Sequence, residues 1–442
     1  MRPSLVSSTQ ARRSAKRGTP AVLSLAGTPL AFLLTGFTWL SASFLFGIAL
    51  IIGLVYGTPL PHWLKPVHVH GALVGGIVQL AIGAVLCSIA GSSDRKDAFA
   101  ETRPALFLTF NGATAALLLG FWLRNMLITG LAGLVMSVTV LSLFKTVWIH
   151  VGKAPVTGSL YRIALGALLG GLAAGLSIAF RLSEGYYTYA RLAHIHLIVL
   201  GFVTIVFVVA LHQILPALLQ TPPIHERMTK FALWSLPPGF ALLLAAFLMS
   251  VLWLQIVVGC LLMASIGFYT FQLLATWLRS GSQGTAATDH LLIGAFFLLL
   301  ATVTGLAMSA NYLQDPPLLP IGSLHLMAYT HLAFIGFIMQ VICGSLSFFV
   351  PQLVSTTRVQ NHAKQEVYRT ALDAIMNRWR WGQLAGLSLG TMALSVLASL
   401  TWSVPLSSPY VLISMWTAVT LLVFSLALFV AKLSWAIGLR PS

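Results

Sequence analysis

The chain has 442 residues, of which 58% are hydrophobic and only 8% are charged, and its mean hydropathy is +0.90. This composition excludes a water-soluble globular protein, a disordered protein and, because only three cysteines are present, a small secreted domain held together by disulfides. The formal net charge of +16 accompanies long apolar stretches, so we expect a lipid bilayer as the partner of this chain and no nucleic acid.

Twelve apolar stretches along the chain are long enough to cross a bilayer, which takes roughly 20 residues. They lie at about 30–56, 66–90, 104–124, 126–150, 160–181, 190–218, 230–252, 253–278, 290–311, 322–353, 381–402 and 409–436. The sequence therefore predicts an all-α, polytopic membrane protein of about 12 transmembrane helices, in which residues 21–442 form a single transmembrane domain.

The basic residues predict which side of the membrane each loop faces. Residues 1–20 are basic, carry no acidic residue and have no clear cleavage site, so we expect a cytoplasmic tail and not a signal peptide. From that start, only four of the 25 Lys and Arg face outward, namely Lys65, Arg124, Arg181 and Arg191. We expect a multi-pass protein of a bacterial inner (cytoplasmic) membrane, with both termini cytoplasmic.

The longest loop of this topology, residues 355–380, is rich in charged side chains of both signs. A solvated loop is the simpler interpretation of this segment, and it is the one we prefer. An amphipathic cytoplasmic helix is the alternative.

A histidine motif occurs three times, always at the outer end of a span that runs inward. The copies end at His70, His196 and His331, and in each copy a glycine follows this histidine by five positions. About four spans separate successive copies. The motif therefore predicts three pseudo-repeated four-helix units, with the histidines on the second, sixth and tenth helices, at about 30–150, 160–278 and 290–436.

Each of these histidines has a companion histidine on the opposite side of its helix. His68 and His194 precede their partners by two positions, which is about 200° around an α-helix. His325 precedes its partner by six positions, which is about 240°. We therefore expect all three helices to present one histidine on each of two opposed faces, in the outer third of the membrane.

Grouped intramembrane histidines point to a metal or haem centre. One such histidine alone is more often a hydrogen-bonded packing residue, but six at matched depth are costly unless they have partners. The spans hold essentially no carboxylate near their centres, and imidazole ligates iron and copper. Two opposed histidines form the axial pair of a low-spin haem, whereas a single one leaves an open position for a gas.

Twelve spans in three units, with histidines at the outer ends of the second, sixth and tenth, resemble subunit I of the heme-copper oxidase superfamily. The phrases at 194–202 and 331–337 look like its divergent, nitric-oxide-reductase-like branch. The resemblance implies one or two haem b groups, the first between the second and tenth helices, and a neighbouring copper or non-haem iron. Its candidate ligands are His68 or His70 with His325 or His331 for the haems, and His194 and His196 for the neighbouring metal.

The resemblance also implies a function and a partner. The function is electron transfer or the reduction of nitric oxide or oxygen, and the partner is a cytochrome c-type subunit or another electron donor on the outer face. Arg181 and Arg191, beside the sixth span, are candidates to bind haem propionates; ordinary interfacial anchoring is the alternative.

Two departures from the family leave enzyme activity open. The family's copper or iron site uses adjacent histidines on the seventh helix, and residues 230–252 contain none. The sixth span also lacks an acidic residue. The function expected is thus a haem-binding membrane redox protein without the usual seventh-helix copper ligands.

Two alternatives remain. One is a non-catalytic haem or copper protein similar to the nitric-oxide-response membrane proteins. The other is a secondary transporter, which is less expected because transporters repeat in two halves around a midplane site, whereas this chain repeats three times and places its polar residues near one surface.

Overall fold

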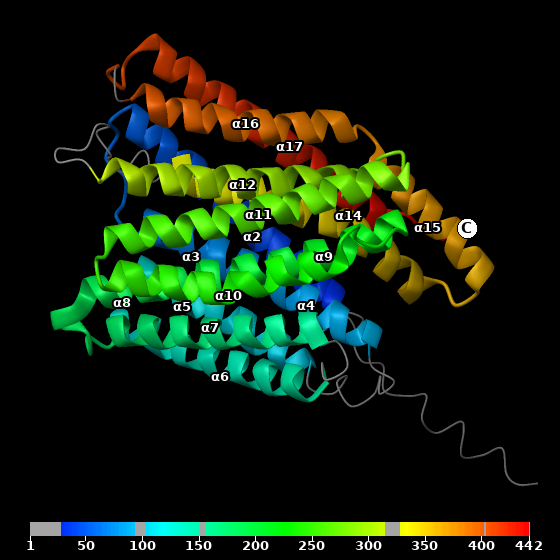
Figure 1. The fold of residues 1–442 in the computed structure, drawn as a ribbon, viewed down its shortest axis with the longest axis horizontal. Helices are drawn as coiled ribbons and strands as arrows, with labels where there is room; N and C mark the ends of the chain where they lie inside the picture. Colours follow the sequence, from blue (N-terminus) through cyan, green and yellow to red (C-terminus); the bar gives the residue numbers. More distant parts are fainter. Residues whose placement is uncertain (1–27, 93–102, 151–154, 314–327, 402–403, 442) are drawn as a thin grey trace, which may run out of the picture.

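The computed structural model describes residues 28–92, 103–150, 155–313, 328–401 and 404–441 (Figure 1). Every regular element in these residues is a helix, and twelve of the helices are long and apolar enough to cross a membrane. The prediction of an all-α, multi-pass membrane protein with about 12 spans is confirmed.

The helices fall into three successive groups with the same order. The first group contains α2 (Pro29–Val55), α3 (Leu64–His70), η1 (Gly71–Val78), α4 (Gln79–Ser92), α5 (Arg103–Trp122) and α6 (Met126–His150). The second contains α7 (Pro155–Ala179), η2 (Glu184–Tyr186), α8 (Tyr187–His196), η3 (Leu197–Thr204), α9 (Ile205–Leu219), α10 (Glu226–Leu248) and α11 (Leu252–Ser280). The third contains α12 (Ala286–Asn311), η4 (Leu332–Met339), α14 (Gln340–Arg358), α15 (His362–Asn377), α16 (Arg380–Leu400) and α17 (Pro409–Gly438).

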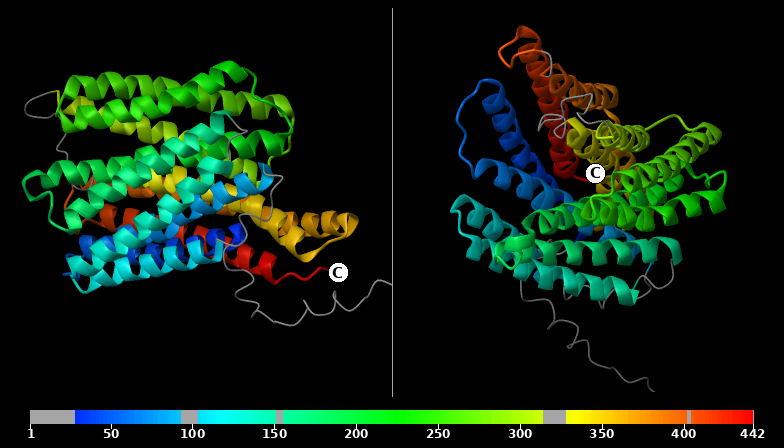
Figure 2. Two further views of the ribbon diagram at one scale, coloured as in Figure 1. Left: turned by 90° about the horizontal axis from the view of Figure 1, so that it is seen from below. Right: turned by 60° about the vertical axis from the view of Figure 1, so that its left-hand side comes forward.

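Contacts between helices repeat from group to group. In each group the first helix packs on the second (α2 on η1 and α4, α7 on η3, α12 on η4 and α14), and the third packs on the fourth (α5 on α6, α10 on α11, α16 on α17). Between groups, α6 contacts α7, α11 contacts α12, and α17 contacts α2. The three groups therefore close into a ring, which the order of colours around the bundle displays in the right-hand view of Figure 2.

The three motif-bearing helices form the centre of this ring. Over their most apolar stretches, 67%, 50% and 67% of the residues of the second, sixth and tenth spans are buried, against 17–44% in the other nine. Leu80 on α4, Phe207 on α9 and Leu346 on α14 meet around a gap of about 20 Å³. A helix that is apolar all round is one that other helices surround, so the sequence pattern accounts for this central position.

Each central helix widens into a π-helical segment directly after its motif histidine. The segments η1, η3 and η4 are all eight residues long and begin immediately after His70, His196 and His331, respectively. π-helical turns are rare and occur frequently at functional sites. The threefold sequence motif is thus matched by a threefold feature of the backbone.

The segment expected to be a solvated loop contains a helix instead, so that prediction is wrong. Asn361 caps α15 by accepting hydrogen bonds from the backbone N–H groups of Ala363 and Lys364. Tyr368 and Leu372 lie on its buried face, four positions apart. The high density of charge in this segment disguised its apolar stripe.

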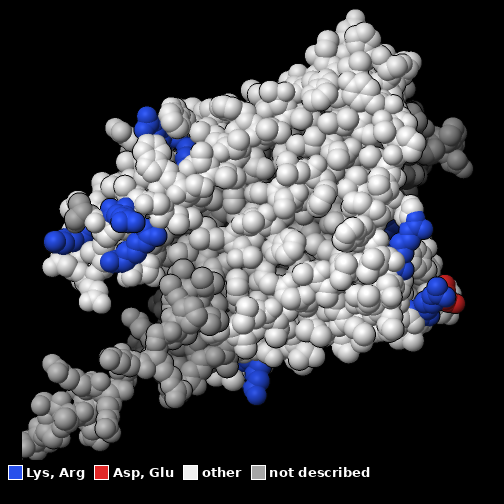
Figure 3. Space-filling model, turned by 180° about the vertical axis from the view of Figure 1, so that it is seen from behind, with Lys and Arg blue, Asp and Glu red and all other residues white. Residues whose placement is uncertain are grey.

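The bundle has two ends that differ in their contents. The end where α3 and α8 lie, on the left in Figure 1, is called the histidine end, and the other is called the α15 end. On the face drawn in Figure 3, Lys and Arg side chains lie toward both ends and the lower edge, and the broad surface between them has none. An uncharged band between charged ends is what a membrane-spanning bundle requires.

Candidate functional site

The motif histidines that the structure describes lie together at the histidine end. His68 and His70 are on α3, His194 and His196 are on α8, and His331 directly precedes η4. All five side chains are half-buried. His325 lies outside the described residues. The histidines His70, His196 and His331 are called the motif histidines below, and the position two residues before each of them is called the companion position.

The companion histidines of the first two groups are held by the first helix of their own group. His68 Nδ1 donates to the backbone carbonyl of Ser43 on α2 at 2.7 Å, and His194 Nδ1 donates to that of Gly171 on α7 at 2.8 Å. A carbonyl oxygen can only accept, so the proton must be on Nδ1. Both imidazoles therefore keep their lone pair on Nε2, which is the atom that binds a metal.

A glycine four residues after each carbonyl makes room for the ring. A Cβ placed on Gly47 would come within 2.7 Å of His68 Cε1, and one on Gly175 would come within 2.8 Å of His194 Cε1 and Nδ1. Real Cβ atoms do not approach other heavy atoms this closely. The first helix thus offers the same pair of features, a carbonyl and a glycine one turn apart, to both companion histidines.

The motif histidines are oriented by their own helix. His70 Nδ1 donates to the carbonyl of Pro66 at 2.9 Å, and His196 Nδ1 donates to that of Leu192 at 2.8 Å. Each acceptor lies four residues earlier in the same helix. The same argument about the carbonyl places the lone pair of these two rings on Nε2 as well.

His70 and His194 face each other across the boundary between the first and second groups. Their ring centroids are 6.4 Å apart and their planes differ by 25°. Two metal–nitrogen bonds of about 2.0–2.1 Å, plus about 1.1 Å from each nitrogen to its own ring centre, put the centroids of two imidazoles on opposite sides of one metal at roughly 6.3 Å. The centroid separation is therefore similar to that of two imidazoles on one metal, and in this structure the two rings are stacked.

Aromatic rings cover two of the motif histidines, His70 and His196, on another side. The ring of Phe121, at the end of α5, lies 4.3 Å from that of His70, and the ring of Phe247, at the end of α10, lies 4.7 Å from that of His196. Phe121 and Phe247 belong to the third helix of their groups, so this contact also repeats. An apolar ring beside an imidazole limits access of water to it and restricts its rotation.

The third group places a tyrosine at the companion position. A Cβ on Gly305 of α12 would come within 3.0 Å of Tyr329 Cε2, so Tyr329 covers this glycine as His68 covers Gly47. The sequence analysis expected His325 to supply the companion ring on this helix. Tyr329 occupies the position two residues before His331, whereas His325 lies outside the described residues, so its place stays a prediction.

The register on the first helix is the same in all three groups. The motif glycines Gly75, Gly201 and Gly336 abut Trp39, Ala167 and Phe297, respectively, and these residues precede Gly47, Gly175 and Gly305 by eight positions in every group. Each π-helical segment therefore packs on its first helix at one height, and each companion ring packs two turns further along. The site is built from three copies of one helix pair.

The described residues contain no group of three His, Cys, Asp or Glu side chains that could hold a metal ion. These residues therefore do not fit a three-ligand copper or non-haem iron site. The resemblance implied a haem between the second and tenth helices, whereas the histidine pair seen in contact joins the second helix to the sixth.

The two arginines considered for propionates lie at the histidine end near α8. Arg181 is exposed, and its Nε is 4.0 Å from Glu184 Oε1. Arg191 on α8 is also exposed. Neither side chain makes a contact that ties it to the histidine pair, so their role stays a prediction.

Sequence reasoning missed the residues that hold the rings. Ser43 and Gly171 act through backbone carbonyls, which leave no signal in the side-chain sequence. Gly47 and Gly175 are two glycines among many on apolar helices. Their shared spacing from the next motif could have been found only if the register between helices were already known.

Comparison with known proteins adds no family to this picture. No protein-family model matches the chain, and no curated protein sequence matches it.

Proposed function

We propose that this chain is a haem-binding membrane redox protein in which His70 and His194 would hold a haem b. The observation that carries the proposal is the geometry of this pair. The two ring centroids are 6.4 Å apart, and both Nδ1 atoms are tied back to carbonyls, so both lone pairs are on Nε2. Neutral imidazoles without a carboxylate partner are the donor set that haem iron takes.

The haem would supply a one-electron couple when bound, and the protein's residues would hold it in place. Hydrogen bonds from Nδ1 to Pro66 and Gly171 fix the tautomer and the direction of each ring, and such bonds also raise the basicity of the ligating nitrogen. The carbonyl of Gly171 belongs to a packed helix backbone and not to a mobile side chain. The ring of His194 is therefore positioned by helix packing, which favours small rearrangement on electron transfer.

A second centre is supported by the threefold register. The pair in contact joins a motif histidine, His70, to the companion of the next group, His194. The corresponding pair across the third and first groups consists of His331 and His68. This is also the pairing of tenth and second helices that the resemblance implies, so we infer a second bis-histidine haem there.

The proposed activity is electron transfer. A centre with two histidine ligands has no free position for a gas, and the described residues lack a three-ligand metal site beside it. An electron donor, such as a cytochrome c-type subunit, would dock at the histidine end, where Arg181 and Arg191 are exposed. The distribution of Lys and Arg supports a bacterial inner membrane location in which this end faces outward and both termini are cytoplasmic.

The test is a reduced-minus-oxidised absorption spectrum of the purified full-length protein, with pyridine hemochrome quantification and metal analysis. We expect one or two haem b per chain with a low-spin spectrum. His70→Ala should remove one low-spin haem per chain. His62→Ala is the matched control, because His62 also lies at the histidine end, where its Nδ1 accepts from Arg124 at 2.8 Å, and it should leave the spectrum unchanged.

Three results would contradict the proposal. Protein without stoichiometric haem would overturn it, and so would an unchanged spectrum in His70→Ala. Stoichiometric copper in place of haem would overturn the haem assignment and convert the same histidine pair into a copper site.

A further inference from the structure

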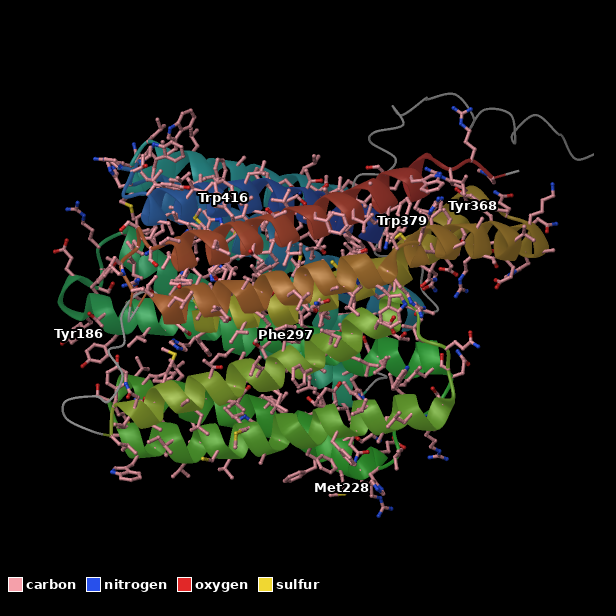
Figure 4. All side chains as sticks on the ribbon, turned by 90° about the horizontal axis from the view of Figure 1, so that it is seen from above. Tyr186, Met228, Phe297, Tyr368, Trp379 and Trp416 are labelled. Atoms are coloured by element: carbon pink, nitrogen blue, oxygen red, sulfur yellow. The ribbon has the colours of Figure 1, made fainter. Side chains whose placement is uncertain are left out.

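A cluster of Arg and Trp lies at the α15 end, far from the histidines. Arg378, Trp379, Arg380 and Trp381 follow one another where α15 ends and α16 begins. Trp379 and Trp381 are 57% and 63% exposed. Figure 4 displays Trp379 near Tyr368 at one end of the bundle, with Trp416 and Tyr186 at the other. Trp379 and Trp381 flank the start of α16, and the start of a membrane span is where a membrane boundary lies.

The two arginines differ in how their charge is used. Arg380 Nε lies 3.4 Å from Asp289 Oδ2, and Arg380 also donates to the carbonyl of Gly284. Arg378 instead lies between two indoles, with its guanidinium carbon 4.4 Å from the ring of Trp379 and 5.2 Å from that of Trp435 on α17. Among the described residues no carboxylate pairs with Arg378. Its N–H groups are therefore available to an anion.

An open groove of about 820 Å³ begins beside this cluster and runs between α16 and α17. Trp379, Arg380 and Trp381 form its upper wall, and Phe424 and Leu428 of α17 line it further in. Gly382 also lines it, and a Cβ there would only reach ordinary contact with Phe424, at 3.9 Å. The groove is thus apolar along its length. Arg380, which is paired with Asp289, lines its end, and Arg378 lies outside the lining but stacks on the lining residue Trp379.

The backbone at the head of the groove is strained. Trp379 has φ of 52°, which is the left-handed region that bulky residues rarely adopt. Strain of this kind persists only where surrounding contacts over-determine it, and it gathers at binding sites. Here it sets Trp379 beside Arg378 at the head of the groove.

We propose that this groove binds one anionic phospholipid, with its phosphate on Arg378 and one acyl chain along Phe424 and Leu428. Guanidinium groups bind phosphate through two parallel hydrogen bonds, and basic pockets between transmembrane helices are suited to acidic headgroups. A free phosphate would not contact the apolar part of the groove, whereas the acyl chain of a lipid would. This inference rests on no histidine and does not depend on the proposed haem.

The test compares lipid binding to the full-length protein in detergent by native mass spectrometry, with phosphatidylglycerol and phosphatidylcholine titrated separately. We expect one phosphatidylglycerol per chain to bind in preference to phosphatidylcholine. Arg378→Gln should reduce this preference about five- to tenfold, as expected for loss of one cation near a headgroup. Arg369→Gln is the matched control, because Arg369 lies on α15 and its Nε is 3.7 Å from Asp373 Oδ2, and it should leave the preference intact.

A second variant tests the acyl chain separately. Leu428→Trp fills the groove while Arg378 stays in place, and it should also weaken phosphatidylglycerol binding. Equal preference in Arg378→Gln and the unmodified protein would overturn the proposal. Displacement of the lipid by millimolar inorganic phosphate, or full binding in Leu428→Trp, would overturn it as well, because the site would then be an anion site and not a lipid site.

Discussion

The first two groups of helices and the third use one packing register for different chemistry. In the first two, a histidine covers a glycine of the first helix and donates to a carbonyl one turn away. In the third, Tyr329 covers Gly305 at the equivalent position. The glycine provides the space in every case, and the identity of the ring that fills it decides whether a metal ligand results. Repetition of a fold is therefore not repetition of a site.

This difference has a consequence at the boundaries between groups. The first–second boundary joins His70 to His194, and the same register assigns His331 and His68 to the third–first boundary. At the second–third boundary the register assigns His196 and Tyr329, which supply one imidazole in place of two. Among the described residues, this register therefore provides for at most two bis-histidine centres.

The largest expected effect is on the ligand itself. His194→Ala removes one of the two imidazoles of the contacting pair, and we expect loss of one low-spin haem per chain. Tyr329→Phe keeps the ring at the equivalent position of the third group and should leave haem content unchanged. Pyridine hemochrome quantification measures both. Equal loss in the two variants would mean that the companion positions are alike in function, contrary to the comparison.

The next effect is on the space that holds the ring. Gly175→Ala places a methyl group within 2.8 Å of His194, so the ring must move and its bond to Gly171 must weaken. We expect haem affinity to fall about 10–100-fold, as for other changes that disturb the support of a ligand. Alanine favours helix, so folding should not suffer.

Gly305→Ala is the control for this prediction. It crowds Tyr329 to a similar degree but touches no histidine of the pair. Haem titration of the apoprotein measures both affinities. A loss in Gly305→Ala as large as that in Gly175→Ala would show that the effect is general disturbance of helix packing.

A smaller effect concerns a glutamine that follows the motif histidine by nine positions in the first and third groups. Gln340 receives a hydrogen bond from His290 and donates to Ser388 Oγ at 3.0 Å. Gln79 is fully buried, and within the described part of the chain neither its Nε2 nor its Oε1 has a hydrogen-bond partner. The two glutamines thus occupy equivalent positions, but Gln340 is hydrogen-bonded and Gln79 is not.

We expect Gln340→Leu to destabilise the protein by about 1–3 kcal/mol, because it leaves buried His290 without its partner. Gln79→Leu should be neutral or stabilising, because it removes an unpaired buried amide. Thermal unfolding in one detergent compares the two variants directly. A larger loss of stability in Gln79→Leu would contradict the hydrogen-bond assignment at both positions.

The smallest effect is on the covering phenylalanines. Phe121→Leu and Phe247→Leu keep an apolar side chain beside His70 and His196 but remove the ring contact. Such contacts contribute about 0.5–1.5 kcal/mol, so we expect a small loss of thermal stability in both variants. Haem content should not change in either, and a change in Phe247→Leu alone would point to a separate centre at His196.

The central helices and their histidines could be predicted from the sequence because the signal is local. His70 and Gly75 lie five positions apart on one helix, and the same phrase recurs in each group. Tyr329, at the companion position of the third group, was not considered because a histidine was sought by residue type. The equivalent residue, Tyr329, is found only when its place over Gly305 is known.

Contacts between helices could be predicted less well from the sequence. Which carbonyl receives the proton of His194 depends on how α7 lies against α8, and the identity of Gly171 does not encode this. The pairing of His70 with His194 likewise depends on how the first and second groups meet. α15 is different, because its apolar spacing was visible in the sequence and was outweighed by the density of charge.

The π-helical segments have a consequence for how these helices can change. A π turn contains one residue more than an α turn, and each residue of an α-helix turns the chain by about 100°. If the same residues of η1 formed an ordinary α-helix instead, the one extra residue would therefore swing His70 about 100° away from α8 while α4 stays in the apolar centre. Each π-helical segment changes the direction in which the residues on its two sides point. One end of the helix can therefore face the protein core while the other end presents a ligand in a different direction.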